Sequence, residues 1–545
     1  MSGYGLACTV TFPRVRDVGG PMPAAYALRL GELVATFALA QDNAFGQPLE
    51  SQLRSCLLAT WMAEEAGYDA RLKETIYWAA LLRYLGCTGH AHEVAVYLGD
   101  EIAARARTLV HDAANPAEVA SDVIALASAA RPDQDPEQVA RAVMETIHGW
   151  AVSNFGAGCE VADLLAQRLG FPGEVREALA CTFERWNGLG VPRGVAGEDI
   201  PLAMRVVHVS HDMEAIARLV SPGDALATVV NRRDRTYDPA LADLFATYGA
   251  GWLERLAKLD PWDAVLDLEP TPGRLLSGEA LDDALAVVAD FVDLKSPYLA
   301  GFSRRCADLV YSAARHAGLD ADGAMLLRRA AWVHDIGLTG VPNTILDKPT
   351  PLTRAENDRF EVHPLLTEQV LRRTPALSVL NPVACAHHEH ADGSGFHKGL
   401  AAQACHPWAG LLTVANAFVS LTTEHASGPA LSPSAAAQEL RRRASTGRYE
   451  TRATEAVLEA AGQGKTRRSR QPPRPSYPGG LTAREAEVLR LAARGLTTGQ
   501  IAGRLEISAK TADHHIQHVY TKTGVSSRGA AALWAMEHGL VSGVA

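Results

Sequence analysis

The carboxyl end of the chain carries apolar residues at helical spacing, interrupted by polar turns. Thr482 is placed to cap a helix, and Glu485 three residues later completes a capping box. Gly495 is placed to end this helix. Its predicted buried stripe consists of Leu481, Val488, Leu489, Leu491 and Ala492.

Three more short helices are predicted after the first. The second starts near Thr498, and Ser508 can cap the third, which Gly524 stops. The fourth follows Ser527 and ends near Gly539. Four short helices with a tight turn between the second and the third are typical of a helix-turn-helix unit.

A helix in mid-chain is apolar along its length and polar at its end. The residues that we expect to face inward are Leu326, Leu327, Ala330 and Val333. His334 and Asp335 follow at once, and burying a charge there requires a partner or a metal ion. The alternative is a set of histidines that hydrogen bonds satisfy inside a packed helical core.

The composition is that of an ordinary globular protein. The 545 residues are 47% hydrophobic and 21% charged, and a chain of this length is expected to form about two to four domains. The eight cysteines occur singly, without a CxxC pair, which argues against a zinc ribbon or a disulfide framework and favours a reduced, cytoplasmic setting. We find no signal peptide and no apolar run of membrane-spanning length, so no membrane partner is expected.

Positive charge gathers at the carboxyl end. From Gln463 onward there are twelve Lys or Arg and five Asp or Glu, a net +7, whereas the whole chain is −10 and its first 462 residues therefore carry −17. The stretch 462–480 has four prolines, four glycines and five cations, which predicts an extended linker. A basic tail on an acidic body favours a tail that binds a polyanion, although a solubilising tail is the plainer interpretation.

The predicted helix-turn-helix resembles the LuxR-type DNA-binding domain. The matching residues are Leu481-Thr482, Glu485, Val488-Leu489, Gly495, Ile501-Ala502, Leu505, Ser508, Thr511, His515, Lys522 and Gly524-Val525. The resemblance implies that double-stranded DNA is the partner and that the third helix lies in its major groove. A unit of this size binds weakly alone, so a homodimer on two half-sites is expected.

The resemblance also supplies candidate DNA-binding residues. Those expected to face DNA from the third helix are Lys510, Thr511, His514, His515 and Lys522. Ser508 and Thr498 would hold phosphate through a hydroxyl or a helix-terminal N–H group. Asp513 is an awkward neighbour, because a carboxylate repels phosphate unless it accepts a hydrogen bond from cytosine.

The mid-chain motif resembles the HD-GYP branch of the HD phosphohydrolases over about Ser296 to Gly462. The matching words are HDIG from His334, GVPNTILDKP from Gly340, His363, AHHE ending at Glu389, and Asp392-Gly393-Ser394-Gly395. That family binds two first-row metal ions through imidazoles and a bridging carboxylate, and the ions activate a water for attack on a phosphodiester. The metal-binding candidates are therefore His334, Asp335, His363, His387 and His388.

The sequence departs from the family pattern at four places. Phe302 stands where a first His is expected, Leu338 replaces a Lys, Gly395-Phe396-His397 replaces Gly-Tyr-Pro, and Asn416 replaces a final Asp. One metal position is thereby reduced to His334 and Asp335. The other could still hold one iron, manganese or zinc ion. No catalytic residue is assigned, and hydrolysis of cyclic di-GMP is the less favoured interpretation.

The first half of the chain is predicted to be an eroded copy of the second. AALLRYLGCTG from Ala79 aligns with AAWVHDIGLTG from Ala330, and ERWNGLGVPRG from Glu184 aligns with EHADGSGFHKG from Glu389. Arg83-Tyr84 then take the place of His334-Asp335, so this copy lacks the metal motif. A longer spacing indicates an insertion near 108–141. We expect His208, His211 and Asp212 to be structural.

We therefore expect an all-α protein with two HD-type helical domains followed by a four-helix LuxR-type domain. The expected boundaries are 1–260 for the degenerate HD-GYP-like domain, 275–461 for the second HD-GYP-like domain, 462–479 for the linker and 480–545 for the DNA-binding domain. The expected function is transcriptional regulation in the cytoplasm, on the nucleoid when bound to DNA. The HD-type domains would act as a sensory and dimerisation module for a small-molecule effector. The alternatives are a metal-dependent phosphodiesterase with a DNA-binding tail, and a scaffold for oligomerisation.

Overall fold

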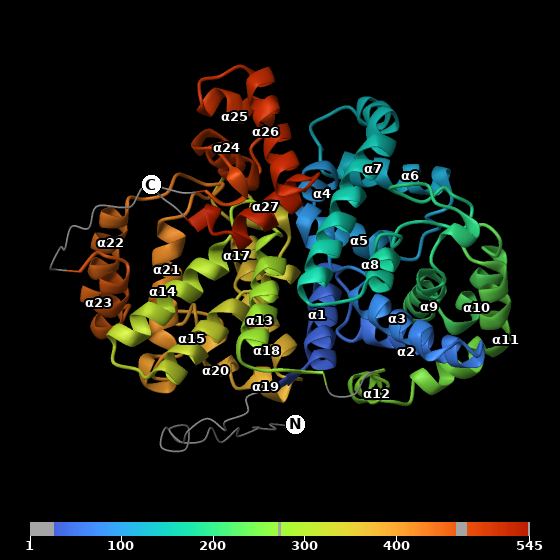
Figure 1. Cartoon of the computed structure of the whole chain (residues 1–545), viewed down its shortest axis with the longest axis horizontal. Coiled ribbons are helices and arrows are strands. Elements are labelled where there is room, and N and C mark those ends of the chain that lie inside the picture. The colour runs from blue at the N-terminus through green and yellow to red at the C-terminus, as the bar shows by residue number, and fades with distance from the viewer. Residues whose placement is uncertain (1–26, 271–273, 465–476, 543–545) are drawn as a thin grey trace, which may run out of the picture.

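The computed structural model describes residues 27–270, 274–464 and 477–542, and these fold almost entirely into helices, as predicted (Figure 1). Within these ranges the one regular strand pair joins β1 (Leu28–Arg29) to β2 (Leu275–Leu276) in antiparallel register. None of the helices described is long and apolar enough to cross a bilayer. Most of the predicted linker, residues 465–476, lies outside the described ranges.

The first half of the chain builds one helical unit around α2, α3 and α9, whose apolar faces pack together. The predicted insertion contributes α6 and the start of α7, and these two helices pack on each other through Val123, Ala127, Val139 and Val143. The elements are α1 (Leu30–Ala44), α2 (Ser51–Glu65), α3 (Ala70–Leu82), η1 (Cys87–His90), α4 (Ala91–Leu98), α5 (Glu101–Thr108), α6 (Pro116–Ala129), α7 (Pro136–Arg168), α8 (Gly173–Leu179), η2 (Gly197–Asp199), α9 (Leu202–Leu219), α10 (Pro222–Asn231), α11 (Pro239–Leu256) and α12 (Pro261–Asp267).

The second half builds a similar unit in which α14 packs against α15, α21 and α23. Its elements are α13 (Gly278–Asp293), α14 (Phe302–His316), α15 (Ala321–Val333), η3 (Ile336–Gly340), α16 (Asn343–Leu346), α17 (Arg354–Phe360), α18 (His363–Leu371), α19 (Pro375–Ser378), α20 (Asn381–Ala384), η4 (Ala402–Ala404), α21 (Ala409–Leu421), α22 (Pro433–Ser445) and α23 (Thr451–Ala460).

The same local hydrogen bonds recur in both halves and support the predicted repeat. The carboxylate of Glu184 accepts from the backbone N–H groups of Arg193 at 2.8 Å and Val195 at 3.0 Å. Glu389 accepts from the N–H groups nine and eleven residues later, at 2.8 and 2.7 Å. A glycine in each loop, Gly190 or Gly395, lies so close to the Glu backbone that a Cβ there would collide with it. The same carboxylate-braced loop is therefore built twice.

A buried ion pair joins the two halves. The ammonium of Lys295 lies 2.6 Å from the carboxylate of Glu101, and both side chains are completely buried. Glu101 also accepts from the backbone N–H of Asn343, whose side-chain amide donates to the carbonyl of Lys295. Removing either charge would leave the other buried without a partner, which typically costs about 3–5 kcal/mol. The halves are thus held in one arrangement.

The C-terminal unit has the four helices and the caps that the sequence predicts. Thr482 accepts from the N–H of Glu485 while Glu485 accepts from the N–H of Thr482. Ser508 caps the third helix, and Gly524 ends it with a φ of 72°. The elements are η5 (Pro478–Gly480), α24 (Ala483–Ala493), α25 (Thr498–Arg504), α26 (Ala509–Thr523), α27 (Arg528–Glu537) and η6 (Leu540–Ser542).

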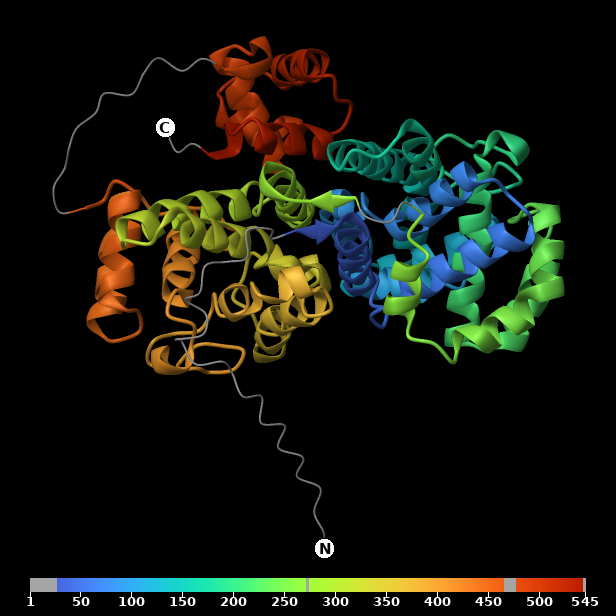
Figure 2. The same cartoon turned by 60° about the horizontal axis from the view of Figure 1, so that its bottom comes forward.

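The C-terminal unit rests on the body through α27, which packs on α7 and η1. The backbone N–H of Ser526 donates to the carboxylate of Glu160 at 2.7 Å. A Cβ at Gly529 would lie only 3.0 Å from the carbonyl oxygen of Gly89, so the two backbones meet directly. In Figures 1 and 2 the unit stands on the body with α25 and α26 at its far side.

Candidate functional site

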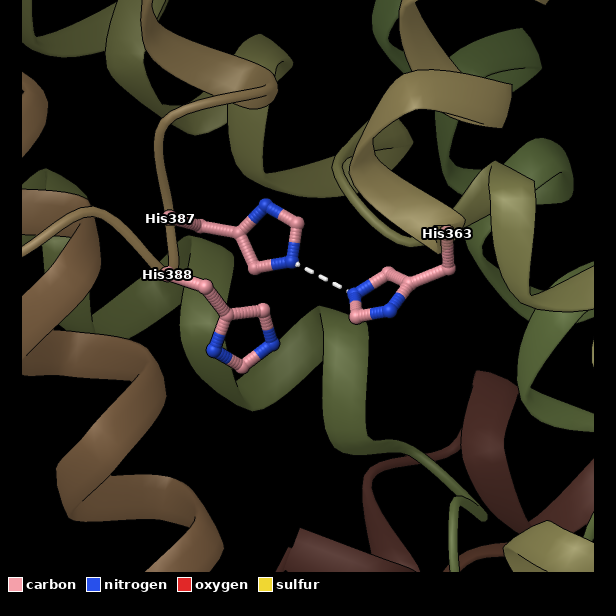
Figure 3. Close-up of side chains that lie close together, drawn as sticks. All are labelled: His363, His387 and His388. Carbon is pink, nitrogen blue, oxygen red and sulfur yellow. Dashed lines mark hydrogen bonds between the residues drawn. The ribbon is translucent and has the colours of Figure 1, made fainter. Parts of the chain in front are cut away.

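Five polar side chains from three parts of the second half meet in its core. His334 caps the C-terminus of α15 and Asp335 follows it. His363 begins α18, and His387 and His388 come shortly after α20. Figure 3 shows His363 and His387 pointing toward one another with His388 beside them. Fold and sequence spacing thus bring together all five residues predicted as metal ligands.

Three of the histidines are held with the same ring orientation. The Nδ1 of His334 bonds to the carbonyl of Ala331 at 2.7 Å, and that of His363 to Phe360 at 2.7 Å. The Nδ1 of His387 bonds in the same way to Ala384 at 2.6 Å. A carbonyl can only accept, so Nδ1 carries the hydrogen in each ring and Nε2 presents a lone pair. This is the arrangement that orients histidine ligands in metal sites.

The Nε2 atoms converge on Asp335. The Nε2 atoms of His363 and His387 lie 3.0 Å apart. The Oδ1 of Asp335 lies 3.2 Å from Nε2 of His387 and 3.6 Å from Nε2 of His363. The Nε2 of His334 and the Oδ1 of Asp335 are buried without a well-aligned hydrogen bond. Buried lone pairs that face one another are costly unless a proton or a cation lies between them.

The charge states suit a cation. Burial, together with the neighbouring His387, lowers the pKa of His363 to about 3. Burial also lowers the pKa of His388 well below its usual value. Burial alone would raise the pKa of Asp335, but His334 and His387 hold that pKa well below its usual range. At neutral pH His363, His387 and His388 therefore offer neutral imidazoles beside the carboxylate of Asp335, the forms that bind a metal. Burial would lower the pKa of His334, but the carboxylate of Asp335 raises it above its usual value.

Two overlapping ligand sets are present among the residues described. One is His363, His387 and His388, and the other is His334, Asp335 and His387. In each set one ligand atom per residue lies within 4.8 Å of the others, so either set is compact enough to hold one ion. His387 belongs to both sets, and the residues therefore fit a single ion better than two separate ones.

Three of the four positions that depart from the family pattern are apolar or neutral and buried. Phe302 is 5% exposed, and its ring stacks beside His334 with a centroid distance of 6.3 Å. Leu338 is buried in η3 and Asn416 in α21. Phe396, from the glycine-rich loop, stacks on His388 at 4.4 Å. Aromatic rings thus pack against the imidazoles on two sides, and neither ring can bind a metal.

Among the described residues of the first half, 27–270, there is no such cluster. Arg83 caps α3 as His334 caps α15, and Gly86 packs on the carbonyl of Gly158 as Gly337 packs on that of His363. When the loop glutamates Glu184 and Glu389 are aligned, Thr182 and Phe183 take the positions of His387 and His388.

The three polar residues on α9 that we expected to be structural have partners within the fold. His208 bonds to the carbonyls of Cys181 and Thr182. His211 bonds to Asp212, which also accepts from Tyr237. Neither ligand set among the described residues includes any of the three.

The predicted DNA-binding residues lie on α26 and at two helix starts. Lys510, Thr511 and His514 are exposed, and His515 is half-buried. Ser508 accepts from the N–H of Thr511 and bonds to its hydroxyl.

Lys522 has intramolecular partners that the sequence did not reveal, and Thr498 does not supply the hydroxyl that caps α25. The ammonium of Lys522 lies 2.6 Å from the carboxylate of Glu485 and also donates to the carbonyl of Gly480. Thr498 is the first residue of α25, and the hydroxyl that caps this helix belongs to Thr497. Lys522 therefore ties α26 to α24, and Thr498 can offer a helix-terminal N–H group.

Asp293 is a further buried acid that the sequence analysis overlooked. Its carboxylate accepts from the backbone N–H and the hydroxyl of Ser303 at 2.9 and 2.7 Å. Burial, with Asp290 and Asp335 nearby, raises the pKa of Asp293 to about 8. A signal was present in the repeat, because Asp42 accepts from the N–H of Gln52, also ten residues later.

Two family models match the chain. One describes the HD domain and matches residues 159–241 and 286–452, one segment in each half. The other describes bacterial regulatory proteins of the LuxR family and matches residues 480–535. Both families predicted from the sequence are confirmed.

The relatives found are phosphodiesterases. The chain is 28% identical over 403 residues to 3'3'-cGAMP-specific phosphodiesterase 3 of Vibrio cholerae, covering 72% of this chain and 86% of that protein. It is 37% identical over 97 residues to a cyclic di-GMP phosphodiesterase of Thermotoga maritima, covering 17% and 26%. The crystal structure of the V. cholerae cyclic GMP-AMP phosphodiesterase V-cGAP3 superimposes with a TM-score of 0.56 at 23% identity, over 80% of this chain and 98% of that one, which shows a shared fold.

Proposed function

This chain combines HD domains with a regulatory domain of the bacterial LuxR family, and from that premise we propose that it is a transcriptional regulator whose tandem HD-type domains form a sensory and dimerisation module. The observation that carries the proposal is the placement of α26. Its residues Lys510, Thr511 and His514 are exposed, and the contact of the unit with α7 and η1 is made by α27. A helix presented in this way can enter a major groove while α27 keeps its contact with α7.

Genome-wide binding tests this function directly. The full chain is incubated with fragmented genomic DNA, and the bound fragments are sequenced at near-physiological salt. We expect a reproducible set of fragments, and we expect the double substitution Lys510→Ala with Thr511→Ala to lose that set. Lys258→Ala removes an exposed cation from the body and is the matched control. Equal recovery of random and genomic fragments by the unmodified chain would refute the proposal.

A second candidate function is a metal-dependent phosphohydrolase. It is supported by the likeness to the 3'3'-cGAMP-specific phosphodiesterase and by the cluster around Asp335. Asp335, His363, His387 and His388 would hold the ion, and a bound iron, manganese or zinc ion supplies Lewis acidity and an acidified water. The chain's own contribution is to hold Nε2 of each ring inward and to exclude water behind Phe302 and Phe396.

Turnover assays separate the two functions. The metal-loaded chain is incubated with 3'3'-cGAMP and with cyclic di-GMP, alongside a His387→Ala variant. We expect no turnover that depends on His387, because Phe302 occupies the place beside His334 where a further ligand would be needed. Turnover that disappears in His387→Ala would establish the phosphohydrolase instead.

A further inference from the structure

A large cavity occupies the first half at the place that corresponds to the histidine cluster of the second. Its volume is about 750 Å³, within the usual range for small-molecule sites. Arg83, Tyr84 and Phe183 line it, and these residues take the positions of His334, Asp335 and His388 in the repeat. The predicted insertion forms part of one wall through the start of α6, and the middle of α7, just after the insertion, continues that wall. The first half thus has a cavity in place of the histidine cluster, and α6 and α7 cover it.

The cavity wall has an excess of positive charge. Four arginines line it, and the carboxylates that line it are those of Asp122 and Asp212. Asp122 is paired with His111, and Asp212 accepts from His211 and Tyr237. Both carboxylates therefore have partners other than the arginines of the wall, and Arg83 is the one arginine of the described wall that lies within 4.0 Å of either.

Arg185 is the cation with the least compensation. Its residue is 7% exposed, and its guanidinium donates to the carbonyls of Thr182 and Glu184. The Nε of Arg185 has no partner, and no carboxylate of the described residues lies within 4.0 Å of this guanidinium. Arg83 nearby is 4% exposed, with its Nε also unpartnered and Asp212 3.9 Å away. Buried guanidinium groups in this state are stabilised by an anion that enters the cavity.

Aromatic rings also line the cavity. The rings of Phe45 and Tyr84 stack at 3.8 Å, and those of Phe155 and Phe183 lie 4.4 Å apart. Trp150, from α7, also lines the cavity. Aromatic faces favour planar ligands, which stack on them and lose few internal rotations on binding.

We propose that this cavity is a binding site for a planar aromatic organic anion, with Arg185 and Arg83 binding the anionic group and the Phe and Tyr rings holding the ring system. The site requires no metal and no property of the C-terminal unit. It therefore stands or falls independently of DNA binding.

The proposal is tested with two dyes that differ in one anionic group. 1-Anilinonaphthalene-8-sulfonate is a sulfonate that carries flat aromatic ring systems, and N-phenyl-1-naphthylamine is its uncharged counterpart. Fluorescence titration of the full chain should give saturable binding of the sulfonate. Arg185→Gln should weaken binding of the sulfonate by about tenfold or more, because a charge-assisted contact is lost, and should leave binding of the neutral dye within about twofold.

Matched controls distinguish the site from nonspecific binding. Arg141→Gln removes the same charge from an exposed position of α7 and should leave sulfonate binding unchanged. Ala120→Trp fills the cavity from α6 and should abolish binding of both dyes, whereas Ser121→Trp, at an exposed position next to it, should not. If Arg185→Gln fails to fold, Arg185→Lys, which keeps the charge, and Ala120→Trp still decide the matter.

Three results would overturn the proposal. One is no saturable sulfonate binding by the unmodified chain. The second is equal weakening by Arg185→Gln and Arg141→Gln, which would indicate a general charge effect. The third is tighter binding of the neutral dye than of the sulfonate in the unmodified chain, which would indicate a site for uncharged apolar molecules.

Discussion

The Nε2 atoms of His363 and His387 lie 3.0 Å apart, and both rings donate their Nδ1 hydrogen to backbone carbonyls. The two lone pairs face each other in a buried place beside the carboxylate of Asp335. The backbone therefore holds the rings in an orientation that is unfavourable by itself and favourable around a cation.

We predict that the full chain binds about one divalent ion and that His387→Ala abolishes this binding, because His387 belongs to both ligand sets. Mass spectrometry of metals after dialysis against iron, manganese or zinc gives the stoichiometry. At a free ion concentration of about 100 times Kd, binding should raise the free energy of unfolding by roughly 3 kcal/mol. His316→Ala removes an exposed histidine and should retain the ion. An unchanged metal content in His387→Ala would contradict the prediction.

The glycine-rich loop sets the position of His388. A Cβ at Gly395 would lie 2.4 Å from the carbonyl oxygen of His388 and 2.6 Å from Cα of Glu389, so the backbone would have to move. We predict that Gly395→Ala lowers the free energy of unfolding by about 1–3 kcal/mol and weakens metal binding. Gly428→Ala, where nothing lies within 4 Å, is the control. Chemical denaturation with and without metal measures both effects, and equal stability of the two variants would count against this account.

The ion pair between Glu485 and Lys522 makes the stability of the C-terminal unit depend on pH. Burial would raise the pKa of Glu485, but Lys522 and the capping contacts of Thr482 lower it from 4.5 to about 2. A carboxyl whose folded pKa is lowered contributes stability above its unfolded pKa and loses it as the pH falls through its folded pKa. The contribution, about 1–2 kcal/mol after allowing for solvent around Lys522, should therefore be present at pH 5 and disappear toward pH 2.

Hydrogen exchange measured on peptides from 483–493 tests this window. At neutral pH, Glu485→Gln should exchange faster than the unmodified chain, because the ion pair with Lys522 is lost. At about pH 2.5 most of the difference should have vanished, since Glu485 is then protonated in the unfolded chain and partly protonated in the folded one. A difference of the same size at both values would show that the ion pair does not stabilise α24.

The features that were predictable from the sequence are those encoded within a few residues. The capping box at Thr482 and the left-handed Gly524 depend on local backbone geometry, and both are present. Most of the histidines were predictable because HDIG and AHHE are short sequence motifs, and each follows the end of a helix. The role of Lys522 was not evident, because its partner Glu485 lies 37 residues away on another helix.

The cavity could not be predicted for a related reason. Arg83-Tyr84 stood out in the sequence as replacements for His334-Asp335, but nothing near Arg185 indicated that it lies beside them without a carboxylate. That arrangement depends on how α6 and α7 cover the repeat, and α6 and the start of α7 come from the insertion. Packing between distant segments creates such sites, and local patterns carry little information about it.

The last prediction concerns the contact between α27 and the body. Helix α7 lines the cavity through Trp150 and reaches the C-terminal unit through Glu160 and Val161. The first 462 residues carry a net charge of −17, so docking keeps a large negative charge close to any DNA on α26. Gly529→Val would press a side chain against the carbonyl of Gly89 and separate the two surfaces.

We predict that Gly529→Val binds DNA more tightly than the unmodified chain, by about three- to tenfold at low salt, because the acidic body moves away from the phosphates. The gain should shrink near physiological salt, where the screening length falls to about 8 Å. Hydrogen exchange should confirm release by faster exchange in 158–162 and 528–537. Gly251→Val, at an exposed site with nothing within 4 Å, controls for general destabilisation. Suppose that hydrogen exchange shows release of α27 from the body but DNA affinity at low salt does not rise. The charge of the body then does not weaken DNA binding by the C-terminal unit. The body would instead have to act by holding the C-terminal units of a dimer at a fixed spacing.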